Sequence, residues 1–142
     1  MKIAFSEIPG SGARYRINEQ PAFPDQDVCL KRPVTGSLTI HLSSEHHALL
    51  TGEIATRISR VCDRCCRTFG LDLQVDFTYE CIVGEDPSPN HTEVEVEDEA
   101  CNRLYVNEPV IELTEILQEQ IYLALPAQIL CESSCKGLCP RC

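Results

Sequence analysis

Six cysteines in two short clusters are the residues of this chain best suited to bind a metal ion. The first cluster is a CxxC pair, Cys62 and Cys65. A zinc ion in a structural site takes four sulfur or nitrogen ligands, and two close pairs from distant parts of a chain commonly supply them. We therefore expect a structural zinc site that uses at least four of the six thiols. The second cluster has the spacing C-x3-C-x3-C-x2-C and consists of Cys131, Cys135, Cys139 and Cys142.

Two sets of four thiols are compatible with this spacing. One set joins the CxxC pair to Cys131 and Cys135, and the other joins it to Cys139 and Cys142. The CPxC form of the last pair is typical of a zinc-ribbon knuckle. Both sets would be closed, with no open position for water, and a closed zinc site is structural rather than catalytic. Both sets stay open at this point.

The sequence contains few signals of an enzyme. It has no glycine-rich phosphate loop and no Ser/His/Asp constellation. The rival hypothesis from another class is a thiol oxidoreductase that uses Cys62 and Cys65. In such enzymes the CxxC opens a helix, which lowers the thiolate pKa, whereas here we expect it between two strands. We therefore expect no catalysis and no small-molecule substrate. The four histidines have no ligand spacing to the thiols: His41, His46, His47 and His91.

The charge balance and the apolar runs limit the kinds of partner and the cellular compartment that we expect. Twelve basic and 22 acidic residues give a net charge of -10. This argues against coating nucleic acid by charge alone and favours solubility or a basic partner. No apolar signal core follows Met1, and no run approaches the roughly 18 apolar residues of a membrane span. We expect a cytoplasmic protein without membrane contact, whose thiols stay reduced.

Alternating apolar residues predict the strands that position the first thiol pair. Period-2 patterns predict strands over 38–42 and 49–61, and the clearest pattern predicts a long strand over 69–83. The last two would form an antiparallel hairpin with the CxxC at its tip. Residues 3–8 resemble an edge strand, and the segment from there to residue 27 looks irregular. Three cysteines outside the clusters are expected in the core, where a thiol behaves as a small hydrophobe: Cys29, Cys81 and Cys101.

The C-terminal half predicts one helix and a returning tail. Seven of the fifteen residues in 85–99 are acidic, which indicates a solvated loop, with a docking surface for a basic protein as the alternative. A short strand is expected at 104–106. Apolar residues at helical spacing predict an amphipathic helix over 113–124 that covers the sheet. The predicted fold is α+β: one domain, 1–142, with a mainly antiparallel sheet, one C-terminal helix and a Cys-rich tail, 131–142, docked by metal.

Several of these segments together resemble a known family. They are the CDRC of 62–65, Glu112-Leu113 opening the helix, the Leu-Ala-Leu-Pro of 123–126, and the tail with its Lys-Gly-Leu-Cys-Pro-Arg-Cys of 136–142. They are similar to the YceD family of bacteria and plastids. The resemblance implies a factor in ribosome biogenesis, because that family is linked to accumulation of large-subunit ribosomal RNA and its genes often neighbour one for a large-subunit ribosomal protein.

The resemblance also bears on the choice of ligands. Family members with degraded tails keep a ligand-like residue near Cys131, which favours the set with Cys131 and Cys135. Members commonly continue past the last cysteine with a glycine and an Asn-Leu-Asn segment, so Cys139 and Cys142 are expected to lack their own partners here. A second departure is Cys66, which makes a CxxCC.

Basic residues crowd the predicted hairpin tip. Four arginines lie within eleven residues, and Lys136 and Arg141 would join them if the tail docks there. Four thiolates around zinc carry a net charge of about -2, so these residues would balance the site. The sharper hypothesis is a bipolar protein, with the basic end toward large-subunit ribosomal RNA or its precursor and 85–99 toward a basic ribosomal protein. A generic zinc-stabilised interaction module is the alternative. The candidate RNA contacts are Arg57, Arg60, Arg64 and Arg67.

Overall fold

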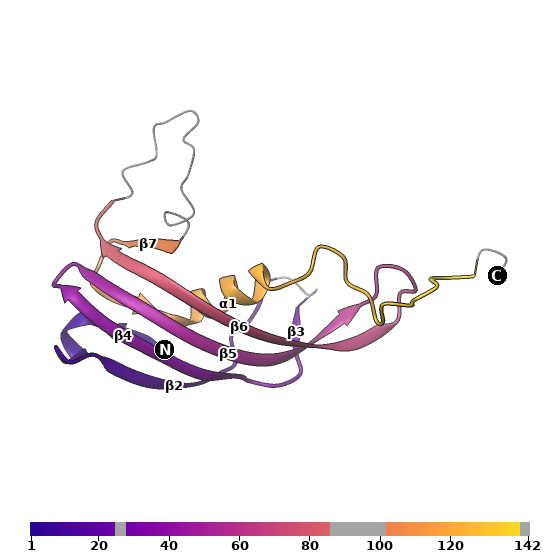
Figure 1. Cartoon of the computed structure of the whole chain (residues 1–142), viewed down its shortest axis with the longest axis horizontal. Coiled ribbons are helices and arrows are strands. Elements are labelled where there is room, and N and C mark those ends of the chain that lie inside the picture. The colour runs from indigo at the N-terminus through magenta and orange to yellow at the C-terminus, as the bar shows by residue number, and fades with distance from the viewer. Residues whose placement is uncertain (25–27, 86–101, 140–142) are drawn as a thin grey trace, which may run out of the picture.

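Two long antiparallel strands, β5 (His47–Val61) and β6 (Thr68–Val83), run through the whole fold in the computed structural model (Figure 1). The structure describes residues 1–24, 28–85 and 102–139. Pairing of the two strands is continuous from His47 opposite Ile82 to Val61 opposite Thr68. The strands therefore form a stiff, extended ribbon that carries residues 62–67 far from the centre of the sheet.

The other strands complete a sheet in the order β2-β4-β5-β6-β7. All neighbours in it are antiparallel except β6 and β7, which are parallel. A two-residue strand, β3, pairs with β5 beyond the end of β4, and β1 and β8 form a small separate sheet. The α+β class with a mostly antiparallel sheet is confirmed. The remaining bounds are β1 Lys2–Ala4, the 3-10 helix η1 Phe5–Glu7, β2 Ala13–Glu19, β3 Cys29–Leu30, β4 Val34–Ser44, β7 Arg103–Val106, β8 Val110–Glu112 and α1 Leu113–Leu123.

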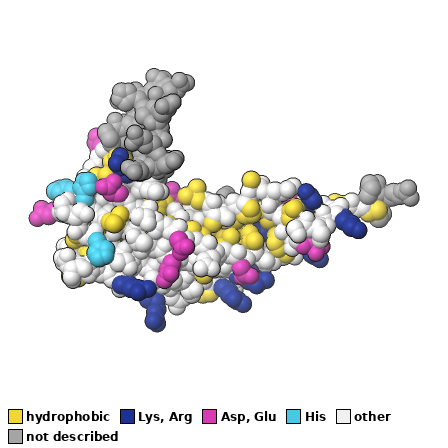
Figure 2. All heavy atoms as spheres, viewed as in Figure 1, with side chains coloured by type: hydrophobic (Ala, Val, Ile, Leu, Met, Phe, Trp, Pro, Cys, Tyr) yellow, Lys and Arg dark blue, Asp and Glu magenta, His cyan; other side chains and the backbone are white. Residues whose placement is uncertain are grey.

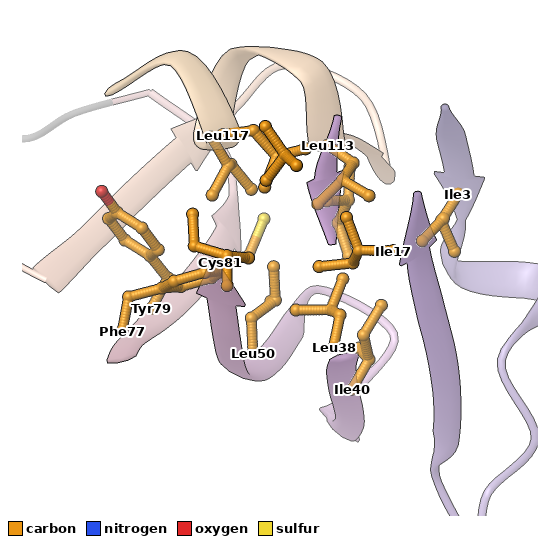
Figure 3. Close-up of a cluster of buried hydrophobic side chains, with 14 of the residues drawn as sticks. Ile3, Ile17, Leu38, Ile40, Leu50, Phe77, Tyr79, Cys81, Leu113 and Leu117 are labelled. Carbon is orange, nitrogen blue, oxygen red and sulfur yellow. The ribbon is translucent and has the colours of Figure 1, made fainter. Parts of the chain in front are cut away.

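The helix α1 packs on one face of the sheet, and the core lies between them (Figure 3). Leu113, Leu117 and Ile121 have no exposed surface, because their spacing places all three on the sheet side of the helix. Gln120 is buried beside them and donates a hydrogen bond to the Tyr79 hydroxyl at 2.6 Å. That hydrogen bond satisfies both polar groups, so α1 is fixed over β6 by packing and by one specific contact.

Two expectations about this part of the chain are wrong. Residues 13–19 form the edge strand β2, although only Ile17 of the seven is buried, which makes the alternation too weak to recognise. Cys29 is exposed on the short edge strand β3, so it is not a core thiol. Cys81 is fully buried, as expected, and burial raises the pKa of its thiol to about 11. The strand expected at 3–8 is limited to Lys2–Ala4 and continues into η1.

Several predicted features lie outside the described residues. They are His91, Cys101, Arg141, Cys142 and all of the acidic segment after Glu85.

Candidate metal centre

The first thiol pair lies in the tight turn that joins β5 to β6. The Cys62 N–H donates to the Arg67 carbonyl at 2.9 Å, and the Cys66 N–H donates to the Cys62 carbonyl at 2.9 Å. Cys66 has a positive φ of 57°, the left-handed conformation in which such turns reverse direction. The turn is thus closed by two backbone hydrogen bonds. It fixes the Cys62 and Cys65 sulfurs close to one another.

Backbone contacts fasten the returning tail to this turn. The Asp63 N–H donates to the Ile129 carbonyl at 2.8 Å, and the Ile129 N–H donates to the Asp63 carboxylate at 2.6 Å. Further along the tail, Arg64 donates to the Cys135 carbonyl at 3.2 Å. Gly137 has a φ of +79°, and a Cβ there would lie 3.3 Å from the Arg64 carbonyl oxygen. The tail therefore packs directly against residues 63 and 64. Its contacts lie both before Cys131, at Ile129, and after Cys135, at Gly137.

These contacts bring four thiols together: Cys62, Cys65, Cys131 and Cys135. Their sulfurs all lie within 4.8 Å of one another. Two of the distances cross between the clusters, 3.8 Å from Cys62 to Cys135 and 3.7 Å from Cys65 to Cys131. Zinc–sulfur bonds of about 2.3 Å in a tetrahedron require sulfurs about 3.8 Å apart. These two distances match that spacing, and the four thiols together could hold a metal ion.

The ionisation of the thiols also fits a cation. Burial opposes the Cys62 thiolate, but hydrogen bonds from the backbone of Cys131, Cys65 and Arg64 outweigh it and lower the pKa of Cys62 to about 6. The Gly137 backbone favours the Cys135 thiolate, yet burial and the neighbouring thiols together raise the pKa of Cys135 to about 12. Burial also raises the pKa of Cys131. The Cys62 thiolate forms readily, whereas Cys131 and Cys135 resist ionisation because of burial and because a second negative charge would lie beside the first. A bound dication would remove this repulsion between the thiolates.

The remaining two clustered cysteines are placed differently. Cys139 is exposed and does not belong to the group of four, and Cys142 lies outside the described residues. Of the two ligand sets that the spacing allows, the structure thus assembles the one with Cys131 and Cys135.

The predicted arginines divide into two pairs. Arg57 forms an ion pair with Asp72 at 3.0 Å, and its guanidinium occupies the space that a side chain at Gly70 would need. Arg60 is half-buried in β5. Arg64 and Arg67 are exposed in the turn. Arg67 interacts with the Cys131 sulfur, and this hydrogen bond is the main reason that the pKa of Arg67 is raised.

Comparison with known proteins places the chain in a family. Residues 50–142 match the family described as "Large ribosomal RNA subunit accumulation protein YceD". The chain belongs to the YceD family. The matched part includes β5 from residue 50 onward, β6, α1 and both thiol clusters, and the strands β1 to β4 precede it. The family name points to a role in large ribosomal subunit RNA accumulation. No curated protein and no solved structure matches the chain.

One structural finding concerns membranes. Among the helices of the described residues, none has the length and apolar character to cross a membrane.

Asp63 is a positioning residue that the sequence did not single out, since nothing in the CxxC spacing identifies Ile129 as its partner. Asp63→Ala removes the acceptor for the Ile129 N–H, so the tail is held less well and the affinity for zinc should fall. Loss of such supporting contacts typically costs about 10–100-fold in metal affinity. Competition with a chromophoric zinc chelator measures it. Asp72→Ala is the matched control, because it removes the same charge from β6 and should leave the affinity unchanged. Equal affinities of the two variants would contradict the role of Asp63.

Proposed function

We propose that this YceD-family chain is a non-enzymatic, zinc-binding factor in ribosome biogenesis that supports accumulation or processing of large-subunit ribosomal RNA in the cytoplasm. The observation that supports it most is the group of four sulfurs within 4.8 Å of one another, which lies in the segment that matches the family. Residues 1–142 would act as one unit. Cys62, Cys65, Cys131 and Cys135 would hold the ion, and Cys139 and Cys142 would not.

The donor set supports zinc in a structural role. Thiolates are soft ligands that favour zinc over magnesium or calcium. Four of them fill a tetrahedral site, so the ion would have no open position at which to activate water. The ion would instead join the turn between β5 and β6 to the tail.

The arrangement of the thiols argues against the oxidoreductase alternative. The CxxC lies in a turn between two strands, whereas in such enzymes it lies at a helix N-terminus. The pKa of Cys62 is lowered here by backbone groups of the turn and of the tail, which belong to the four-thiol group. Cys62 and Cys65 each contact a thiol of the tail, at 3.8 and 3.7 Å, so the pair does not stand alone as a redox CxxC would.

We propose that the RNA contact lies at the metal end, defined here as residues 62–67 and 129–139. Arg64, Arg67 and Lys136 are exposed there, and basic side chains gather at this end of the molecule in Figure 2. Lys31 and Arg32 extend the basic surface, because their N–H groups bond the Arg57 carbonyl on β5. Basic side chains on one surface bind the phosphate backbone and make binding salt-dependent. Arg57 contributes less, since Asp72 already neutralises it.

The RNA contact is tested by replacing exposed basic residues. We expect the double variant Arg64→Ala, Lys136→Ala to bind fragments of large-subunit ribosomal RNA more weakly than the wild type. Because Arg64 also donates to the Cys135 carbonyl, the comparison uses variant protein whose metal content equals that of the wild type. Its salt dependence should fall by about one unit of slope for each phosphate that the variant no longer binds. The double variant Arg16→Ala, Lys2→Ala is the control, because it removes the same charge from residues outside the metal end. Equal weakening in both would indicate non-specific attraction and would contradict a defined RNA surface.

A cellular readout tests the function itself. Depletion of the protein should lower the amount of large-subunit ribosomal RNA relative to small-subunit ribosomal RNA. The wild-type gene should restore the ratio, and the Arg64/Lys136 variant should restore it less. The proposal would fail if depletion left the ratio unchanged. A basic ribosomal protein that docks on residues 85–99 stays a further part of the proposal.

A further inference from the structure

Among the described residues, one edge of the strand β6 has no strand partner over most of its length. On one side β5 pairs with it from Thr68 to Ile82, but on the other side β7 covers only Glu80 to Val83. No other described strand pairs with β6 between Thr68 and Tyr79. An open edge of this length is uncommon, since an unpaired edge is a template for another chain.

Two hydrogen bonds show which residues present their backbone groups to this edge. The Val83 N–H donates to His46 on the β5 side, and the Gly84 N–H donates to Val106 on the β7 side. Successive residues of a strand direct their backbone groups to opposite edges, so the even-numbered residues face the open one. Among the described residues, no loop or helix supplies a backbone partner to them. These residues are Gly70, Asp72, Gln74, Asp76 and Thr78.

Apolar side chains accompany the open edge on the core face of the sheet. Phe69, Leu71 and Val75 are only half-buried there. Figure 2 shows hydrophobic side chains gathered between α1 and the metal end. An unpaired edge beside partly exposed apolar side chains is the combination that accepts an added strand, with backbone hydrogen bonds for affinity and the apolar side chains for register.

The charged side chains beside the open edge indicate the charge of the partner that would bind there. Asp72, Gln74 and Asp76 are exposed on the outer face of β6, and Glu119 of α1 interacts with the Tyr79 hydroxyl at the end of the open stretch. The strand β6 itself carries no lysine or arginine, but Arg57 of β5 pairs with Asp72 at 3.0 Å. Asp76 is then the carboxylate of this stretch that forms no ion pair with a described residue. A second copy of this chain would place like charges opposite one another, which destabilises a strand pair, and its net charge of -10 adds to the repulsion.

We propose that residues 70–78 of β6 bind an extended basic segment of a partner polypeptide by strand addition. The segment alternates apolar and basic residues. Its apolar side chains pack beside Phe69, Leu71 and Val75, and a basic side chain lies toward Asp76. This interaction goes beyond the proposed function and does not depend on it, because neither zinc nor RNA takes part in the contact.

The test uses nine-residue peptides and two substitutions at one position of the full chain. The probe peptide alternates lysine and valine, and the control peptide alternates glutamate and valine, so both have the same strand propensity and apolar face. Gln74→Pro removes an N–H that points to the open edge and leaves the β5–β6 ladder intact, because proline is tolerated on the free side of an edge strand. Gln74→Ala keeps the N–H and is the matched control.

We expect the lysine peptide to bind the wild type and Gln74→Ala equally, and Gln74→Pro at least about 10-fold more weakly, the effect of losing roughly 1.4 kcal/mol. Unchanged thermal unfolding of both variants shows that the sheet is intact, and Asp76→Lys should weaken binding without touching the backbone. Equal binding of the two peptides, or of the proline and alanine variants, would overturn the proposal. Peptide-independent dimerisation that Gln74→Pro abolishes would also overturn it, because a second copy would then be the occupant.

Discussion

Removal of zinc by a chelator should release the tail and the turn while the sheet and the helix stay folded. The metal end has little apolar packing of its own: Ile129 and Cys135 are buried, but Leu138 is 66 % exposed. A few hydrogen bonds and the four sulfurs hold the tail, so it should detach when the ion is removed. The core between α1 and the sheet uses none of these residues. Hydrogen exchange should therefore speed up in 62–67 and 129–139, and β6 and α1 should keep their protection.

The hydrogen-exchange experiment also includes internal controls in the sheet and the helix. The amides of Leu73, Phe77 and Ile121 lie in elements with buried side chains and report on the sheet and the helix. Their exchange should be the same before and after chelation. Loss of protection throughout β6 would mean that the metal contributes to the stability of the whole core, and the picture of a separately fastened tail would be wrong.

Substitution of single cysteines should separate the ligands from the other clustered thiols. Cys131→Ser and Cys135→Ser should lose the metal and lower the unfolding temperature, because each sulfur lies within 4.8 Å of the other three. Cys139→Ser should retain the metal and the stability, because Cys139 is exposed and outside this group. Thermal unfolding with and without added zinc measures the difference. Zinc should stabilise the wild type and Cys139→Ser, since it binds their folded states, and should stabilise the two ligand variants much less.

The opposite pattern would assign the site to the CPxC pair. In that case Cys139→Ser and Cys142→Ser would lose the zinc-dependent stabilisation, and the ligand variants named above would keep it.

The elements that position the thiols could be predicted because their patterns are strong and local. Eight apolar residues at every second position of 69–83 predict β6, and the apolar spacing that ends before Pro126 predicts α1. The strand β2 was missed because it buries a single residue, Ile17. The parallel pairing of β7 depends on how the chain between residues 84 and 102 crosses over, which no local pattern specifies.

The choice of thiols needed the structure for a similar reason. The spacing identifies two compatible sets, and contacts distant in sequence bring the thiols of one of them together. The hydrogen bonds between Asp63 and Ile129 and the left-handed Gly137 against the Arg64 carbonyl determine where the tail lies. None of these contacts has a signature in the spacing of the cysteines. Cys29 has no second cysteine at ligand spacing, which predicts a core thiol, but the short edge strand β3 exposes it instead.

The most direct test of the account is the ratio of zinc to protein in the chain purified without chelator. Elemental analysis should find about one zinc ion per wild-type chain, as four thiolates in a single tetrahedral site imply. The ratio should be the same for Cys139→Ser and close to zero for Cys135→Ser. A folded, full-length protein with no bound metal would contradict the central claim, and so would a Cys135→Ser protein that keeps its zinc.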